Sequence, residues 1–386
     1  MHIALITTSI SLGGISSYLI NFANYLCQSG HKVTVFYTSA VDEIKERLDD
    51  RIKLVVFHQP DQKKIKIVLH YVFNGKLLSM IRLKLRRKNQ KPYIKDIQNI
   101  QYINAKLTKR IEGNYDVAIS SAEFYCNYLV DLKVNSKRKI AWVHPDLSTL
   151  KIDMTISEKV MSHFDRICVV SKACHNSLEN IFPKFKNKII TIENLIDQES
   201  IVKMSKEKID ESVFIKGGLN IVTVCRLDNS SKRLDRLIKI CKYLKLKGVG
   251  FVWNIIGDGK DFQFLHRLAE QENVLDVVNF LGSKTNPYPY IVNSDVFVLT
   301  SQYEGKPIVV DEALALHVPC IVTDYLSAKK QIGLDYGSVI ENNDNTVCEE
   351  FYSVLTEKNI AVWNNNLKNY YVDNEKIKTK INVLLG

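Results

Sequence analysis

Two glutamates in the last quarter of the chain are placed to bind hydroxyl groups. Glu304 follows an apolar run over 295–300 that has the character of a strand. A helix is expected to start at Pro307, because proline suits the first helical position, and Glu312 lies about a turn and a half into it. Glutamates so placed can each hold the vicinal hydroxyls of a sugar, while the amino-terminal end of the helix faces a phosphate. The eight-residue spacing of the two glutamates carries little information by itself. The expected strand before Glu304, together with Gly305 and Pro307 before the helix, is what makes the pair a candidate site.

Two cations stand in a similar setting earlier in the chain. Arg226 follows an apolar run over 219–225, and Lys232 lies six residues further on, where the next helix is expected to begin. Side chains at the carboxyl end of a parallel strand can converge on one ligand, and two cations there suit a departing diphosphate. The alternative is ordinary surface basicity, because 53 residues of the chain are Lys or Arg.

A pair of glycines, Gly13 and Gly14, separates the first apolar run from the first amphipathic segment. Glycine lets the backbone approach a ligand closely, and the start of the following helix offers free N–H groups to an anion. The dinucleotide fingerprint Gly-x-Gly-x-x-Gly is absent. The pair therefore indicates either a phosphate contact or a simple turn.

The elements that must position these residues alternate between strands and helices. Over 2–37 the chain has a strand, a turn, a helix closed by Gly30 and a second strand, which is a βαβ unit. A polar, Lys-rich stretch at 200–218 interrupts the alternation, which then restarts. Apolar residues at 100, 103, 107 and 111 mark a further helix. The predicted strands are 2–8, 32–37, 52–57, 116–120, 139–143, 166–170 and 188–193, then 219–225, 251–257, 277–282, 295–300, 319–323 and 338–340.

Two such runs predict an α/β protein with two Rossmann-like, doubly wound domains facing a cleft. We expect a first domain over 1–200, a second over 213–365, and a C-terminal helix within 366–386 that packs back on the first domain. Ligands of these sheets bind beyond the carboxyl ends of the strands, so the site is expected in the cleft.

The composition excludes several classes of protein. The chain of 386 residues is 46% hydrophobic and 25% charged, which is ordinary globular usage and neither disordered nor collagen-like. No run approaches the 18 or so apolar residues of a membrane span, and the first residues lack the features of a secretory signal. The eight cysteines include no Cys-x-x-Cys pair. We expect a reduced, cytoplasmic protein without a structural metal.

The net charge of +11 is concentrated in one segment. Residues 63–95 contain eleven Lys or Arg residues and no acidic one, so the rest of the chain is formally neutral. Leu77, Ile81 and Leu85 recur within it at helical spacing. This basic segment (63–95) could dock on an anionic membrane surface or be a solvated excursion. Nucleic acid is disfavoured, since no recognised nucleic-acid motif accompanies the charge.

The motifs together resemble a retaining GT-B glycosyltransferase of family 4, the group 1 glycosyltransferases, over almost the whole chain. The segment from Glu304 to Glu312 with 319–324 is the most specific part. Supporting features are Gly13-Gly14, Trp142-Val143-His144, Val170-Ser171-Lys172, 193–197, Arg226 with Lys232, Ile256-Gly257-Asp258-Gly259, Phe280-Leu281-Gly282 and 294–298.

The resemblance implies a role for each matching residue. Arg226 and Lys232 would hold the diphosphate and stabilise the leaving nucleotide, Glu312 would bind the ribose, and Glu304 the donor sugar. His144 would contact that sugar from the first domain. The backbone of Gly305, Lys306, Pro307 and Ile308 would meet sugar and phosphate, and Gly282, Ser283 and Lys284 would border the base.

The resemblance also implies the reaction. A hexose from a nucleotide sugar, UDP-linked, would pass with retained configuration to a lipid-linked or growing saccharide at the inner face of the plasma membrane, in capsule or cell-wall polysaccharide synthesis. No cofactor or metal would be required, and the sequence fits this because it has no Asp-x-Asp motif. No protein nucleophile is expected, because the leaving phosphate would help to deprotonate the acceptor. The alternatives are a basic membrane- or nucleic-acid-docking protein on the same scaffold and a GT-B sugar-nucleotide epimerase.

Three residues depart from the family pattern. Lys306 stands in place of the usual aromatic residue, Arg233 in place of the common glycine after Lys232, and His317 in place of the glycine before Pro319. The first two border the expected donor site, so they bear on which sugar is used and on how the donor is held.

Overall fold

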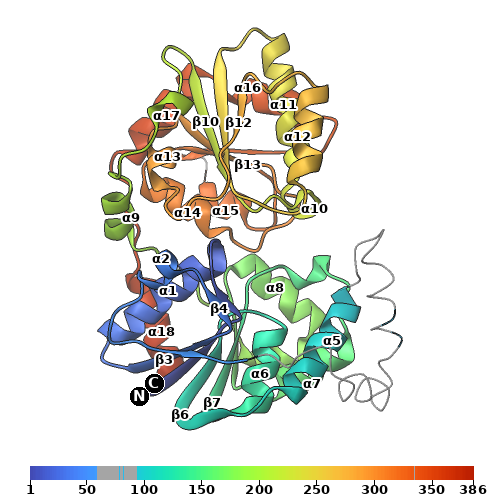
Figure 1. The fold of residues 1–386 in the computed structure, drawn as a ribbon, viewed down its shortest axis with the longest axis vertical. Helices are drawn as coiled ribbons and strands as arrows, with labels where there is room; N and C mark the ends of the chain where they lie inside the picture. Colours follow the sequence, from blue (N-terminus) through green and yellow to red (C-terminus); the bar gives the residue numbers. More distant parts are fainter. Residues whose placement is uncertain (59–77, 79–80, 82–93, 334) are drawn as a thin grey trace. The chain divides into compact units, whose positions relative to one another are not determined.

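The computed structural model describes residues 1–58, 78, 81, 94–333 and 335–386. Two compact units account for them. The first unit comprises Met1–Ser11, Ile15–Asn194 and Ile377–Gly386, and the second comprises Leu12–Gly14 and Leu195–Lys376. Each unit contains a parallel sheet with helices against its two faces (Figure 1). This is the α/β architecture that the alternation of strands and helices predicts.

In the first unit the strand order is β5-β3-β1-β6-β7-β8-β9, with parallel neighbours throughout. These strands are β1 (His2–Ile6), β3 (Lys32–Tyr37), β5 (Lys53–Val56), β6 (Ile111–Ser120), β7 (Val134–Val143), β8 (Arg166–Val169) and β9 (Ile189–Thr191), and β2 (Ser9–Ile10) pairs separately with β4 (Ser39–Ala40). The helices are α1 (Gly14–Gln28), α2 (Asp42–Lys45), α5 (Ile94–Leu107), α6 (Tyr125–Lys133), α7 (Met154–Ser162), α8 (Lys172–Ile181) and α18 (Glu375–Leu385). Trp142, at the end of β7, is fully buried against Tyr18 and Phe22 of α1.

The last helix, α18, packs on the first unit. Its residues Ile381 and Leu384 are buried, and the Arg138 guanidinium on β7 donates hydrogen bonds to the carbonyl oxygens of Leu384 and Leu385. Figure 1 shows the red α18 beside the blue α1, where the Tyr25 hydroxyl donates to Asn382. The carbonyls at the helix end, which have no partner within the helix, thereby gain a cationic donor.

In the second unit the order is β12-β11-β10-β13-β14-β15, again with parallel neighbours. The strands are β10 (Leu219–Val224), β11 (Phe251–Ile256), β12 (Val278–Phe280), β13 (Val296–Leu299), β14 (Cys320–Thr323) and β15 (Gly337–Ile340). The helices are α9 (Gln198–Met204), α10 (Asn229–Lys232), α11 (Leu234–Leu246), α12 (Phe262–Gln271), α13 (Tyr288–Val292), α14 (Ile308–Ala315), α15 (Ala328–Ile332), α16 (Val347–Val354) and α17 (Glu357–Leu367). Buried Trp253 of β11 stacks on Phe351 of α16 in the core.

The observed elements correct several details of the predictions. Every predicted strand is present, with bounds that differ by up to five residues. Ile111 begins β6 instead of extending the helix before it, because it pairs with Val134 of β7, ahead of a register shift between Ile111 and Asn114. Pro307 precedes α14 as its N-cap, and Lys232 ends a short helix instead of opening a long one.

The unit boundaries also differ from the expected domain limits. The chain passes from the first to the second unit at Asn194–Leu195 and returns at Lys376–Ile377, so residues 366–376 cluster with the second unit. The basic segment (63–95) lies outside the described residues except for 78, 81, 94 and 95. Among the helices that are described, none is long and apolar enough to cross a membrane.

Candidate active site

The predicted donor residues gather at one point of the second sheet. The strand β10 lies between β11 and β13, so successive connections run to opposite sides of it. In parallel sheets a ligand crevice forms at such a switch point, outside the carboxyl ends of the strands. Arg226 and Lys232 follow β10 here, and Glu304 follows β13.

Lys232 and Glu304 form an ion pair. The Lys232 ammonium contacts Oε1 of Glu304, which also accepts a hydrogen bond from the Ser301 hydroxyl at 2.7 Å. The two charged side chains are only 18% and 13% exposed. Burial by itself would lower the pKa of Lys232, but the Glu304 carboxylate outweighs that effect and the pKa is raised. A protonated cation and a carboxylate therefore stand side by side in a half-buried position.

Arg226 lies beside this pair with its side chain exposed. Its positive charge opposes the rise in the pKa of Lys232. Its loop is held by two glycines after β11. A Cβ at Gly257 would lie 1.9 Å from the carbonyl oxygen of Cys225, and one at Gly259 would lie 2.4 Å from that of Leu227. Only glycine permits this approach of the two loops.

Glu312 is buried, with 4% of the residue exposed. The hydroxyl of Tyr288, at the start of α13, donates a hydrogen bond to Glu312 Oε1 at 3.1 Å. The sequence predicts that Glu312 faces the cleft, and within the second unit the residue is buried and contacts the Tyr288 hydroxyl. Tyr288 was not among the predicted site residues, because it lies 24 positions away with no local motif.

The loop from Gly305 to Ile308 leads from β13 into α14. Its departure from the family pattern, Lys306, has a defined partner: the ammonium lies 3.0 Å from Asp311 Oδ2 in the first turn of α14. Gln331 of α15 donates to Asp311 Oδ1 and to the carbonyl oxygen of Pro307, both at 2.9 Å. The lysine charge is thereby compensated within the loop and helix that the glutamates occupy.

The residues expected beside the base follow β12. Gly282 has φ +68°, and its carbonyl oxygen accepts a hydrogen bond from the backbone N–H of Gly257 at 2.9 Å. Ser283 is exposed, and the Lys284 ammonium lies 5.7 Å from the ring centroid of Tyr290. The backbone of Gly282 thus joins the loop after β12 to the loop after β11.

The other two departures sit at left-handed backbone positions. Arg233 has φ +50° and His317 has φ +62°, the region in which glycine has no steric penalty and other residues are strained. The Arg233 guanidinium forms a two-pronged pair with Asp235, with both N···O distances 2.9 Å. His317 Nε2 lies 3.1 Å from the carbonyl oxygen of Tyr370. Polar contacts therefore offset the strain where relatives are expected to have glycine.

In the first unit, His144 follows β7. Its Nε2–H donates to the carbonyl oxygen of Ser121 at 2.9 Å, since that oxygen can only accept. Burial lowers the pKa of His144, opposed by the charge of Glu123 and the hydrogen bond to Ser121. A neutral ring with the proton on Nε2 leaves Nδ1 as an acceptor. The glycine pair clusters with the second unit; Gly13 has φ +129° and Gly14 opens α1.

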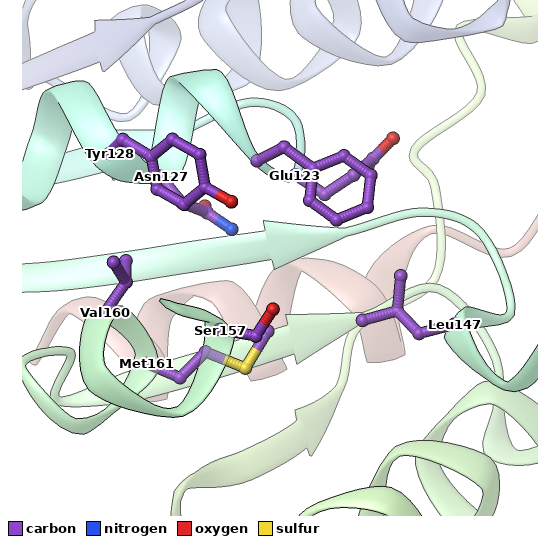
Figure 2. A pocket seen from close by; sticks show the side chains of 8 residues that line it. Glu123, Asn127, Tyr128, Leu147, Ser157, Val160 and Met161 are labelled. Atoms are coloured by element: carbon purple, nitrogen blue, oxygen red, sulfur yellow. The ribbon is translucent and has the colours of Figure 1, made fainter. Parts of the chain in front are cut away.

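A small cavity lies in the first unit near the ends of β6 and β7. Figure 2 shows the lining side chains of α6 and α7, including Asn127 and Ser157, with Leu147 and Glu123 beside them. Its volume is about 10 Å³, which is room for a single water molecule and too small for a sugar. We assign it no substrate.

The described residues bring together part of the predicted site. Lys232 and Glu304 are in contact in the second unit, and Arg226 acts on Lys232 through its charge. Ser301, Tyr288 and Asp311 are partners of Glu304, Glu312 and Lys306 that the sequence did not single out. Ser301 could have been found, because it lies three residues before Glu304 in the same motif. In the described part of the chain, no cluster of three His, Cys, Asp or Glu side chains is arranged to hold a metal ion.

Comparisons with known proteins are consistent with this geometry. Residues 205–366 match the family model for group 1 glycosyl transferases. EpsF of Bacillus subtilis is 38% identical over 98 residues, which is 25% of this chain and 26% of EpsF. An uncharacterized glycosyltransferase of Haemophilus influenzae is 24% identical over 88% of this chain and 83% of its own.

A third relative is the Campylobacter jejuni N-acetylgalactosamine-N,N'-diacetylbacillosaminyl-diphospho-undecaprenol 4-alpha-N-acetylgalactosaminyltransferase. It is 28% identical over 47% of this chain and 49% of its own, so this chain spans about half or less of two of these three relatives. Among solved structures, Anabaena HepE in complex with UDP and glucose matches with a TM-score of 0.72 at 14% identity, over 100% of this chain and 99% of that one. The match of residues 205–366 is therefore to the group 1 glycosyl transferases, the relatives carry glycosyltransferase names, and the solved structures show the GT-B fold over the whole chain.

Proposed function

We propose that the protein transfers a hexose from a UDP-sugar to a lipid-linked or growing saccharide, with retention of configuration. The observation that carries the proposal is the Lys232–Glu304 pair at the switch point of the second sheet. The reaction breaks the bond between the anomeric carbon and the diphosphate, so negative charge grows on the leaving oxygen. A fixed ammonium beside that oxygen stabilises this charge more in the transition state than in the bound donor.

The chemistry of the pair divides the work between its two members. Lys232, assisted by the exposed Arg226, would bind the diphosphate, while Glu304 would accept hydrogen bonds from hydroxyls of the donor sugar. Glu312, whose Oε1 accepts a hydrogen bond from the Tyr288 hydroxyl, would bind the ribose. His144, neutral with Nδ1 as acceptor, would bind a sugar hydroxyl from the first unit.

The relatives support the substrate classes of the proposal. HepE is a structural neighbour solved with UDP and glucose, and the C. jejuni relative is named for a diphospho-undecaprenol-linked acceptor. A saccharide on a prenyl diphosphate is therefore the acceptor class that we propose, with the polysaccharide built on that carrier as the product.

A donor panel tests the proposal. Purified protein is incubated with UDP-sugars and a prenyl-diphosphate saccharide in excess EDTA, and nucleotide release is measured. We expect one UDP-hexose to react in the presence of the chelator, with the anomeric configuration of the product, read by NMR, the same as that of the donor. Inert protein with all donors would refute transfer, inversion would refute retention, and abolition by EDTA with rescue by Mn²⁺ would refute metal independence.

The variant Lys232→Ala tests the central residue. Turnover should fall by about 10²-fold or more, as for loss of an electrostatic group that acts in the transition state. Lys260→Ala is the matched control, because Lys260 pairs with Asp228 at 2.9 Å in the neighbouring loop but is 54% exposed. Equal turnover in the two variants would contradict the role of Lys232.

A further inference from the structure

Next to the Lys232–Glu304 pair lies a polar network that the proposed chemistry does not use. It consists of two arginines from the start of α11 and three residues from two distant loops, and we call it the arginine cluster: Arg233, Arg236, Gln302, Asn342 and Asp344. Arg236 is 2% exposed, which is rare for an arginine and requires that its donors be satisfied.

The two arginines converge on one amide and one carboxylate. Arg236 donates to Gln302 Oε1 at 2.8 Å and to Asp344 Oδ1 at 2.5 Å. Arg233 donates to the same amide oxygen at 3.3 Å and to both oxygens of Asp344 at 2.8 Å. Arg236 also donates to Asn342 Oδ1 at 2.5 Å. The two guanidinium groups therefore hold three acceptor side chains, those of Gln302, Asn342 and Asp344. Lysine cannot reproduce this forked geometry.

The cluster joins the two loops that carry the ion pair. Gln302 lies between Ser301 and Glu304 in the loop after β13, and its backbone N–H donates to the carbonyl oxygen of Ser231 at 2.8 Å. Asn342 closes the same loop from the other side, because its amide donates to the carbonyl oxygen of Gln302 at 3.0 Å. The loop that bears Glu304 is thus fastened to the turn that bears Lys232.

A second contact fixes the backbone of Lys232 itself. The Thr300 hydroxyl lies 3.1 Å from the carbonyl oxygen of Lys232 and 3.0 Å from that of Arg233. Arg233 takes the left-handed backbone conformation directly after Lys232, and its side-chain pairs stabilise that strained turn. These contacts therefore hold the backbone from which the Lys232 side chain extends to Glu304.

We propose that Arg233 and Arg236, with Gln302 between them, are positioning residues of the donor site: they hold Lys232 and Glu304 in register for the departing diphosphate. This inference rests on the proposed function. The inference predicts that substitutions in the arginine cluster slow the chemical step in which Lys232 acts. A small displacement of a catalytic group is enough to lower the rate strongly.

A double-mutant cycle on Arg236 and Lys232 tests the inference. Arg236→Lys keeps a positive charge near Asp344 but loses the fork, and we expect its kcat for nucleotide release to fall about 10-fold. If Arg236 acts through Lys232, the variant with both Arg236→Lys and Lys232→Ala will be no slower than Lys232→Ala alone, to within about twofold. If the residues acted independently, their effects would multiply.

Two further variants separate positioning from folding. Lys242→Met is the matched control, since Lys242 lies on the same helix α11 but pairs outward with Glu272 and is 53% exposed. It should keep wild-type kcat and thermal midpoint. Asp344→Asn weakens the cluster at its exposed member, which is 45% exposed, and should lower kcat severalfold with little change in thermal midpoint.

The outcomes are distinguishable. Wild-type kcat in Arg236→Lys, or a multiplicative double variant, would overturn the positioning role while leaving the proposed function intact. A loss of kcat in Arg236→Lys and Asp344→Asn that only follows a lowered thermal midpoint would also overturn it. If the wild-type protein releases nucleotide from no UDP-sugar, the proposed function is refuted and this inference falls with it.

Discussion

At the scale of single residues, the site is built from charges that compensate one another. Glu304 raises the pKa of Lys232 in spite of burial, and Asp311 forms an ion pair with Lys306 at 3.0 Å. The pKa of Lys232 is raised in the folded state, so its pairing with Glu304 stabilises the fold. This stabilisation is fully present at pH values below the ordinary lysine pKa of about 10.4. That contribution is lost as the pH rises through the folded-state pKa.

This compensation predicts a pH-dependent defect in Glu304→Gln. Without the carboxylate, the effect of burial on Lys232 remains and its pKa must fall, so the ammonium is lost at a lower pH than in the wild type. UDP affinity, measured by calorimetry between pH 7 and 10, should decline earlier along the pH scale in this variant. Glu272→Gln, which removes the partner of exposed Lys242, is the control. Superimposable pH curves for Glu304→Gln and wild type would show that Glu304 does not set the protonation of Lys232.

His144 offers a prediction that separates sugar from nucleotide. It belongs to the first unit, whereas Lys232 and Glu304 belong to the second. In His144→Ala, transfer should fall about 10-fold or more through loss of a group that binds the sugar, while UDP affinity stays within about twofold of wild type. His163→Ala, at a half-exposed histidine that pairs with Asp131, should change neither quantity. A matching loss of UDP affinity in His144→Ala would assign the residue to the nucleotide instead.

At the scale of elements, glycines set how closely the loops of the second sheet pack. Gly257 has φ +143°, and a Cβ there would lie 1.9 Å from the carbonyl oxygen of Cys225, at the end of β10. Gly257→Ala should therefore lower the free energy of unfolding by about 2 kcal/mol or more, through strain and a displaced strand end. Gly250→Ala is the control, because a Cβ at that position meets nothing within 4 Å. The free energies of unfolding of the two variants are measured in urea. Equal values would mean that the loops after β10 and β11 can move apart without loss of stability.

The elements themselves were largely predictable, and the partners of the site were not. The apolar run over 32–37 predicted β3 at its observed limits. A strand of a parallel sheet is buried on both faces, so its residues form a nearly continuous apolar run in the sequence. The helix before β6 was predicted too long, since Ile111 continues the helical spacing but pairs with Val134 in the sheet. Glu304 and Lys232 were predictable from strand ends, whereas the Arg236–Asp344 contact joins residues 108 positions apart and leaves no local signal.

At the scale of the whole molecule, the charge is unevenly divided along the chain. The basic segment (63–95) holds eleven cations and no acidic residue, which equals the net charge of +11. The described donor residues belong to the second unit, while the sequence of the basic segment follows β5 of the first unit and ends within the first turn of α5. A docking role for the segment and a nucleotide role for the second unit are therefore separable by experiment.

We predict that reversing Arg82, Arg86, Arg87 and Lys88 to Glu abolishes binding to anionic vesicles. Each basic residue near such a surface contributes about 1 kcal/mol, and salt weakens that attraction within a Debye length. Wild-type protein should co-sediment with phosphatidylserine vesicles at low salt and be released at high salt, and the variant should stay in the supernatant at both. The variant should also lose transfer to a lipid-linked acceptor presented in vesicles while it keeps the UDP affinity of the wild type. Wild-type protein that remains in the supernatant at low salt would identify the segment as a solvated excursion, and a variant with weakened UDP binding would show that the charges serve the donor instead.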